Sequence, residues 1–263
     1  MPNVKIAILY ICTGKYSIFW EEFYKSAQKN LFPNSEKHFF VFSDASPELF
    51  SNKDISYIYQ PKLGWPDDTL QRFHMFSRIL DKLEKYDFLF FFNANIIFLE
   101  KIYEDILPTK DEGLVFVQHP GFFNKDNKDF SYERNQKSTA FIPYGKGEHY
   151  VCGGINGGTA QAYIKMIQEL KFSIDTDTNK QITAIWHDES HINKYITYNR
   201  YKILSPEYAY PEGCILPFSP KILVLDKNNF GGHNFLRGEN KVKKYIFTKI
   251  KQYLERVWKL QLL

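Results

Sequence analysis

The sequence has few cysteines, and none of them has a metal-binding spacing. Only Cys12, Cys152 and Cys214 occur among 263 residues, and no two of them form a CxxC pair. An odd and sparse set of cysteines also provides no disulfide framework. We therefore expect neither a cysteine-based zinc site nor a fold held by disulfides, and a reducing compartment fits this composition best.

The sequence also lacks a long hydrophobic run near its start. MPNVKIAILYIC contains only a short apolar stretch, whereas a membrane-spanning helix needs about 20 apolar residues. No small-residue cleavage site follows, so the segment predicts a first β-strand instead of a signal peptide. We expect a chain without an anchor or stem that resides in the cytoplasm.

Outside the tail, the chain has no net positive charge. Residues 241–263 contain seven Lys or Arg and one Glu, whereas residues 1–240 contain 27 basic and 29 acidic residues. A nucleic-acid partner is therefore not expected for the chain as a whole. The tail has apolar residues at helical spacing with lysines opposite, which predicts a basic amphipathic helix. Such a helix either lies peripherally on an anionic membrane, here the inner membrane face, or packs on the domain or a second chain.

Aromatic residues, in contrast, are abundant, with 24 Phe and 18 Tyr. Aromatic rings suit a sugar cleft because their faces stack on the apolar faces of pyranoses, but composition alone favours a phenylalanine-rich core.

The alternation of segments predicts an α/β fold with a mostly parallel, Rossmann-like sheet flanked by helices. The expected strands are 4–12, 38–44, 55–59 and 87–99, and the expected helices are 17–30, 68–83 and 159–170, with Asp68 or Thr69 as the N-cap of the second helix and glycine-rich turns at 152–158.

Two asparagines interrupt the most hydrophobic of these strands, FFFNANIIF. Period-two geometry places Asn93 and Asn95 on one face and Ala94 on the other. They either cap the strand end locally or belong to a site at the carboxyl edge of the sheet, where ligands of such folds bind. An Asp-x-Asp pair there would hold a divalent metal on a diphosphate, whereas uncharged amides make a much poorer metal site. We therefore expect no metal cofactor.

The densest polar cluster is WHDESHINKY at 186–195. His187 and His191 have the spacing of a zinc protease motif, but that motif needs Glu directly after the first His, and Asp188 stands there instead. Acidic residues at a helix start are an equally good local interpretation. Neighbouring Trp186 favours a sugar cleft, in which Glu189 is the candidate catalytic carboxylate.

Taken together, the motifs resemble glycosyltransferase family 6, the family of the histo-blood-group A and B transferases, the α-1,3-galactosyltransferase and short bacterial members. The shared motifs run in one order through the chain: YICTGKY, GWPDDTLQRFHMF, FFFNANIIF, QHPGFF, FSYERN, TAFIP, YVCGGINGG, WHDESHINKY and SPEYAYPEG. The resemblance implies a GT-A fold that fills residues 1–240. Residues 1–100 would bind the nucleotide, and residues 101–240 would bind the acceptor and carry catalysis.

The resemblance further implies retaining α-1,3 transfer from a UDP-sugar to a galactose that is often fucosylated. Glu189 matches the nucleophile or charge-stabilising glutamate. The positions that match donor contacts are Ile11, Thr13, Tyr16, Arg72, Asn93, Ala94, Asn95, Cys152, Gly153, Gly154, Asp188, Lys227 and Arg237. Those on the acceptor side are His119, Trp186, His187 and Glu189.

The chain departs from the animal members of the family at two places. Asn93-Ala94-Asn95 replaces Asp-x-Asp, as in bacterial members, so the departing UDP would be neutralised by cations and backbone dipoles. The missing anchor likewise predicts a bacterial protein.

Cys152 and Gly154 align with the pair that sets blood-group donor choice, and Gly154 leaves room for an acetamido group, which favours UDP-N-acetylgalactosamine over UDP-galactose. A glycan-binding protein without activity and a zinc hydrolase remain the alternatives.

Overall fold

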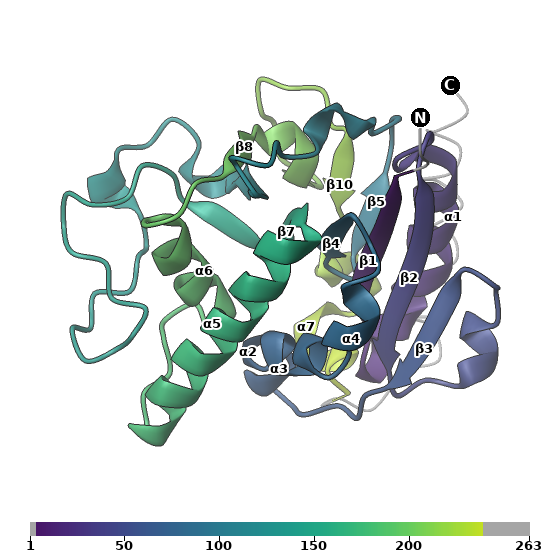
Figure 1. Ribbon diagram of the computed structural model, residues 1–263, viewed down its shortest axis with the longest axis horizontal. Coiled ribbons are helices and arrows are strands. Elements are labelled where there is room, and N and C mark those ends of the chain that lie inside the picture. Colours follow the sequence, from purple (N-terminus) through teal and green to yellow (C-terminus); the bar gives the residue numbers. More distant parts are fainter. Residues whose placement is uncertain (1–3, 239–263) are drawn as a thin grey trace.

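A seven-stranded sheet forms the central layer of the molecule in the computed structural model, which describes residues 4–238 (Figure 1). The strand order is β3-β2-β1-β4-β7-β6-β8. The strands are β1 (Lys5–Ile11), β2 (Glu36–Ser43), β3 (Ile55–Tyr59), β4 (Phe88–Phe92), β6 (Leu114–Gln118), β7 (Val151–Thr159) and β8 (Lys202–Leu204). Only β7 runs antiparallel to its neighbours, so the predicted α/β fold with a mostly parallel sheet is confirmed.

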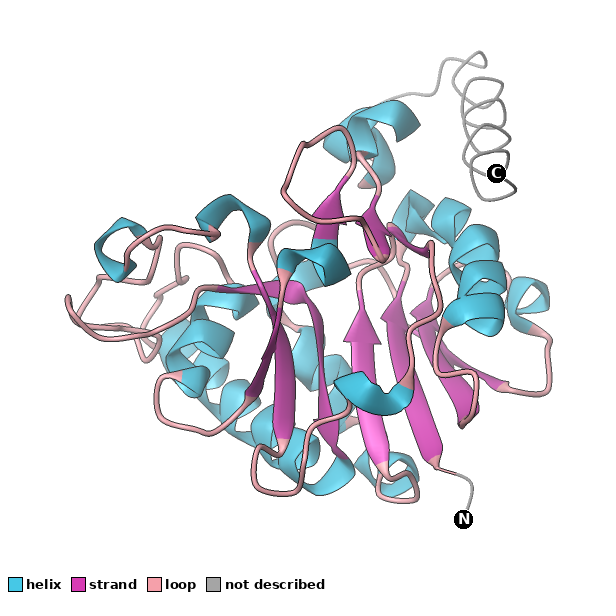
Figure 2. Ribbon diagram, turned by 90° about the horizontal axis from the view of Figure 1, so that it is seen from above, coloured by secondary structure: helices cyan, strands magenta, loops and turns pink. Residues whose placement is uncertain are grey.

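Helices cover both faces of this sheet, as Figures 1 and 2 show. They are α1 (Trp20–Asn30), α2 (Asp67–Leu70), α3 (Arg72–Ser77), α4 (Leu80–Leu83), α5 (Ala160–Asn179), α6 (Asp188–Ile196) and α7 (Gly232–Leu236). In β1, Ile8 and Tyr10 pack on the side of α1, whereas Ala7 and Leu9 pack on the side of α3 and α5. Burial of both faces explains the continuous apolar run at the start of the sequence. Most phenylalanines are buried in these two cores, as composition alone predicts.

The glycine-rich segment is a strand and not a set of turns, which corrects the prediction for 152–158. It forms β7, between β4 and β6. A Cβ at Gly157 would lie 2.5 Å from a ring atom of Phe90 on β4, and one at Gly158 would lie 2.7 Å from the carbonyl oxygen of Gly113. Glycine is therefore needed at Gly157 because the Phe90 ring lies across it, and at Gly158 because the backbone of Gly113 lies close.

Two predicted elements are broken where the chain turns toward the carboxyl edge of the sheet. The predicted strand 87–99 divides into β4 and β5 (Ile96–Phe98), and β5 pairs instead with β10 (Ile222–Val224), which also pairs with β9 (Tyr210–Pro211). The predicted helix 68–83 is three short helices, and α2 begins at Asp67 after Pro66, without a side-chain cap. Two other helices differ only in their bounds, since α1 follows a 3-10 turn over Gly14–Phe19 and α5 extends to Asn179.

Within residues 4–238, no helix is long and apolar enough to cross a membrane. The predicted amphipathic helix at 241–263 lies outside the described residues.

Candidate active site

A cavity of about 240 Å³ opens beyond the carboxyl ends of β1 and β4. It is lined by Ile11, Thr13, Tyr16, Trp65, Asp68, Thr69, Arg72, Phe91, Asn93, Ala94, Asn95, Lys227, His233 and Arg237. The cavity thus brings together nine of the residues that the sequence predicts to contact the donor. The first and the last of them, Ile11 and Arg237, are more than 200 positions apart in the sequence. Its position is the one that ligands take in sheets of this kind.

The asparagine pair lies in a tight chain reversal that is fixed by distant segments. The Asn95 side chain donates from Nδ2 to the carbonyl oxygen of Leu225, at 2.7 Å, and the Leu225 N–H donates back to the Asn95 carbonyl, at 2.9 Å. The Ala94 carbonyl accepts a hydrogen bond from the buried Tyr10 hydroxyl, at 3.0 Å. The predicted strand-like alternation therefore does not hold here, and Asn93, Ala94 and Asn95 all reach the cavity.

Basic side chains of the C-terminal segment form one wall of the cavity. Burial and the nearby charges of Arg237 and Arg72 lower the pKa of Lys227 to about 8. The guanidinium of Arg237 lies 3.9 Å from the ring centroid of Trp65. Within residues 4–238, neither Lys227 nor Arg237 forms an ion pair with a carboxylate. Uncompensated cations around a cavity fit an anionic ligand.

The third cation, Arg72, is already paired. Its Nη1 lies 2.9 Å from Oδ2 of Asp188, both side chains are almost fully buried, and Nη1 also donates to the Gly153 carbonyl. The guanidinium stacks on Phe91, 4.0 Å from the ring centroid. Burial raises the pKa of Asp188 to about 6, and the positive charge of Arg72 opposes this rise. The pair joins the floor of the cavity to the start of α6.

Glu189 lies in the first turn of α6, with both carboxylate oxygens hydrogen-bonded. Tyr150 donates its hydroxyl to Oε1 at 2.9 Å, and the Gly153 N–H donates to Oε2 at 2.7 Å. Burial raises the pKa of Glu189, while these two hydrogen bonds counteract the rise. The carboxylate is thus held in one orientation.

The three β7 residues that were assigned to the donor site lie between the cavity and Glu189. Gly153 contacts Glu189, whereas a Cβ at Gly154 would lie 2.4 Å from Nδ2 of Asn93. The Cys152 thiol points toward the Val117 carbonyl, 3.5 Å away, and burial raises the pKa of this thiol to about 12. The thiol is therefore protonated and packs without offering a nucleophile.

The residues that were assigned to the acceptor lie around α6 and Tyr150. The ring of His119 is 5.7 Å from that of Tyr150, and burial lowers the pKa of His119. The indole of Trp186 is 47% exposed. The ring of His187 packs edge-on against Trp65 with centroids 4.6 Å apart, and its pKa is lowered by burial and by the charge of Arg237.

The zinc alternative does not fit this geometry. His187 precedes α6 and packs on Trp65, whereas His191 is buried, 3.9 Å from Asp177. The two imidazoles therefore occupy different environments, and residues 4–238 contain no group of three His, Cys, Asp or Glu that could hold a metal.

Sequence reasoning missed five residues of the cavity: Trp65, Asp68, Thr69, Phe91 and His233. Asp68, which was predicted as a helix cap, instead accepts the N–H groups of Leu63 and Gly64 and shapes the loop before α2. Trp65 carried the only usable signal, because an exposed tryptophan beside the turn GWPDD is unusual for a surface loop. His233 gave no local signal.

A cavity at the carboxyl edge of the sheet, with cations that are unpaired within residues 4–238 and beside a hydrogen-bonded glutamate, fits the binding of an anionic, nucleotide-like ligand. The pattern of glycosyltransferase family 6 matches residues 1–230, and the chain belongs to this family. It is therefore a hexosyltransferase with a GT-A-type fold that uses a nucleotide-sugar donor and a glycan acceptor.

Relatives in bacteria and animals cover most of the chain. The O-antigen biosynthesis glycosyltransferase WbnI of Escherichia coli is 34% identical over 223 residues, which are 84% of this chain and 94% of that protein. The histo-blood group ABO system transferase 1 of Rattus norvegicus is 27% identical over 81% of this chain, and the match covers 62% of that protein's length. The globoside alpha-1,3-N-acetylgalactosaminyltransferase 1 of Homo sapiens is 28% identical over 86% of this chain and 67% of its own length.

Proposed function

We propose that the protein is a retaining α-1,3-glycosyltransferase that moves N-acetylgalactosamine from its UDP derivative to a fucosylated galactose, giving a blood-group-A-like glycan. UDP-galactose is the alternative donor. The similarity to the globoside alpha-1,3-N-acetylgalactosaminyltransferase supports the α-1,3 linkage and the transferred sugar.

One observation carries this proposal. Two consecutive residues of β7 connect the cavity to the carboxylate, since the Gly154 carbonyl accepts the Asn93 N–H at 2.8 Å and the Gly153 N–H binds Glu189. A UDP group in the cationic cavity would therefore place its sugar over β7, next to Glu189. This is the arrangement that cleavage of the bond between sugar and phosphate requires.

In this arrangement, Glu189 acts on the positive charge that develops at the anomeric carbon. It either forms a covalent glycosyl intermediate or stabilises the cation while the acceptor hydroxyl enters on the face that UDP leaves. In both routes the carboxylate must be ionised. The hydrogen bonds from Tyr150 and Gly153 favour that form against the effect of burial.

We further propose that the diphosphate is held without a metal ion. The asparagine pair offers only neutral amides, and Asn95 already uses its amide group on Leu225. Among the lining residues that the structure describes, Asp68 is the only one with a carboxylate, and this carboxylate is occupied by two backbone N–H groups. Hard divalent cations prefer several carboxylate oxygens, so Lys227 and Arg237 are better suited to neutralise the leaving group.

The preference for N-acetylgalactosamine is supported by Gly154. A methyl group there would overlap the Asn93 amide. Because residue 154 is glycine, the amide keeps its position and does not intrude into the space that the donor sugar would occupy. On the acceptor side, Trp186 is 47% exposed and can stack on a sugar ring, His119 packs near Tyr150, which donates to Glu189, and His187 packs against Trp65.

A donor and acceptor screen that measures UDP release tests this function. UDP-N-acetylgalactosamine and UDP-galactose are each combined with fucosylated and plain galactosides, and a blank without acceptor reports hydrolysis. We expect the highest rate for UDP-N-acetylgalactosamine with a fucosylated galactoside. Glycan binding with no UDP release from any pair would instead identify a carbohydrate-binding protein.

A further inference from the structure

The turn that leads into α6 holds a residue in an unfavourable backbone conformation. The Trp186 carbonyl accepts the Glu189 N–H at 3.1 Å, and His187 stands between them with φ 54° and ψ −127°. That is the first central position of a type II′ turn, which glycine normally occupies. A non-glycine residue remains there only where the surrounding structure holds it.

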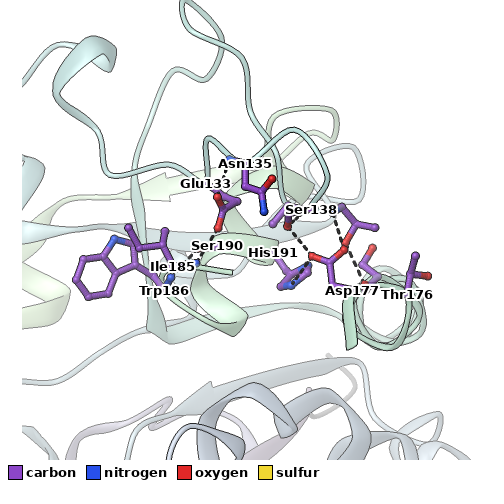
Figure 3. A network of polar contacts seen from close by, with 12 residues as sticks. Glu133, Asn135, Ser138, Thr176, Asp177, Ile185, Trp186, Ser190 and His191 are labelled. Atoms are coloured by element: carbon purple, nitrogen blue, oxygen red, sulfur yellow. Dashed lines mark hydrogen bonds and ion pairs between the residues drawn. The ribbon is translucent and has the colours of Figure 1, made fainter. Parts of the chain in front are cut away.

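Two side chains hold this turn through its backbone N–H groups. The Ile185 N–H donates to Oε2 of Glu133 at 2.8 Å, and the Trp186 N–H donates to Oγ of Ser190 at 3.0 Å (Figure 3). Glu133 is only 7% exposed, and its Oε1 accepts the Asn135 N–H at 2.8 Å. A buried carboxylate from a segment 52 residues earlier therefore fixes the turn.

A second buried carboxylate fastens the same segment to α5. Asp177 accepts the Ser138 hydroxyl and, at 2.7 Å, the Thr139 N–H. Its carbonyl accepts the Ile182 N–H at 2.9 Å, in the loop that leads to the turn. Segment 133–139, the end of α5 and the start of α6 thus form one hydrogen-bonded unit.

The imidazole of His191 lies inside this unit, 3.9 Å from Asp177 (Figure 3). Burial lowers the pKa of His191 to about 4, against the attraction of Asp177 and Glu133. At neutral pH the ring is therefore uncharged, so N–H and O–H donors, and not an ion pair, compensate the two carboxylates. Hydrogen bonds from such donors are directional, so the unit holds the backbone of the turn in one conformation.

The held turn presents apolar side chains outward. Ile185 is 56% exposed and Trp186 47% exposed, although their backbone N–H groups are both satisfied inside the unit. In Figure 3 the indole of Trp186 points away from the carboxylates. Glu189 begins the next turn of the chain, so the orientation of the indole relative to the catalytic carboxylate is set by this backbone.

We propose that Glu133 is a positioning residue for the glycan acceptor, which acts through the Ile185 N–H on the orientation of Trp186. This inference rests on the proposed function. It assigns the segment that carries Glu133 to acceptor affinity and leaves donor binding to the cavity, which contains no residue of that unit.

The test compares Glu133→Gln with the wild type in the full chain. Glutamine keeps one accepting oxygen but turns an NH₂ group toward the other N–H, so the N–H groups of Ile185 and Asn135 can no longer both be bound and the hold on the turn is weakened. We expect the acceptor KM to rise about tenfold, because small misplacements at a site have large effects on productive binding. UDP affinity and UDP release without acceptor should stay within about twofold of the wild type.

Glu104→Gln is the matched control. Glu104 also joins distant loops, since it accepts the Asn34 N–H at 3.0 Å and the Ser35 hydroxyl at 2.8 Å, but it lines no part of the site. It should lower the melting temperature without raising the acceptor KM. Should Glu133→Gln fail to fold, Ser190→Ala removes only the partner of the Trp186 N–H and should raise the acceptor KM in the same way.

Two results would overturn the positioning role. One is an unchanged acceptor KM in the variant that folds, and the other is an equal loss of UDP affinity and acceptor affinity. Both are distinct from failure of the proposed function, in which the wild type itself would release no UDP with any donor and acceptor pair.

Discussion

The cavity beyond β1 and β4 and the unit around Glu133 both contain charged side chains. They differ in whether these charges have partners within the protein. In the cavity, Lys227 and Arg237 form no ion pair within residues 4–238. In the unit, each carboxylate of Glu133 and Asp177 accepts two hydrogen bonds from the chain itself. The unpaired cations of the cavity are available to bind an anionic ligand. The hydrogen-bonded carboxylates of the unit instead fix the backbone to which they are bound.

Glu189 lies between these regions, and its removal should have the largest effect. Glu189→Gln keeps the size and one accepting oxygen, but it loses the negative charge at the anomeric carbon. We expect transfer to fall on the order of 10³-fold, as when other preorganised charge-stabilising groups are removed. UDP release measures the loss, and circular dichroism checks the fold.

Glu112→Gln is the control for this variant, because Glu112 also accepts a backbone N–H, from Thr109 at 2.8 Å, away from the site. It should transfer sugar at the wild-type rate. Full turnover by Glu189→Gln would remove Glu189 from the catalytic role.

The cavity should lose affinity for UDP as pH rises, because one of its cations, the Lys227 ammonium, loses its proton. The pKa of Lys227 is lowered to about 8, so the ammonium is protonated below that pH and neutral above it. UDP should therefore bind about tenfold more weakly at about pH 9.5 than at pH 7, since a hydrogen bond to a charged group contributes about 1.5–3 kcal/mol. Calorimetric titration at the two pH values measures this difference.

Lys227→Arg stays charged over this range and should flatten the dependence. An equally steep loss of affinity in Lys227→Arg would show that another group titrates.

Donor choice should change when the contact between β7 and the asparagine turn is altered. Gly154→Ala places a Cβ 2.4 Å from the Asn93 amide, so this amide must move into the space of the donor sugar. We expect kcat/KM for UDP-N-acetylgalactosamine to fall about tenfold relative to UDP-galactose.

Adding Asn93→Ala to Gly154→Ala separates two causes. If the displaced amide crowds the acetamido group, the double variant should recover the preference. No change of preference in Gly154→Ala alone would mean that this position does not select the donor.

Chelation should have the smallest effect. The cavity offers neutral amides and one occupied carboxylate, so transfer in excess EDTA should stay within about twofold of the untreated rate. Initial rates with and without added manganese test this expectation. Strict dependence on manganese would contradict the role given to Asn93 and Asn95.

Local patterns in the sequence were sufficient to predict β1, β2, β3 and β4, whereas β6, β7 and β8 were not predicted as strands. Strand β3 has the predicted bounds, and β1 differs from its prediction by one residue at each end, because apolar runs depend only on burial. The candidate site residues were reached through the order of motifs, and the structure gathers nine of them around one cavity.

What the sequence could not predict depends on partners far along the chain. The strand breaks at Asn93–Asn95 because Asn95 bonds to Leu225, 130 residues later. Trp65 reaches the cavity edge by packing on Arg237, and Glu133 holds Ile185 across 52 residues. The glycine-rich β7 reads as turns in the sequence, because the groups that exclude a side chain there, such as the Phe90 ring at Gly157 and the Gly113 carbonyl at Gly158, lie on other segments.

The configuration of the first-formed product tests the central claim most directly. The donor sugar is α-linked to UDP, and the account places Glu189 beside its anomeric carbon while the acceptor enters on the side that UDP leaves. Proton NMR of the reaction of the wild type with UDP-N-acetylgalactosamine and a fucosylated galactoside should show the small anomeric coupling of an α-linked product. A β-linked product, with its large coupling, would contradict the account.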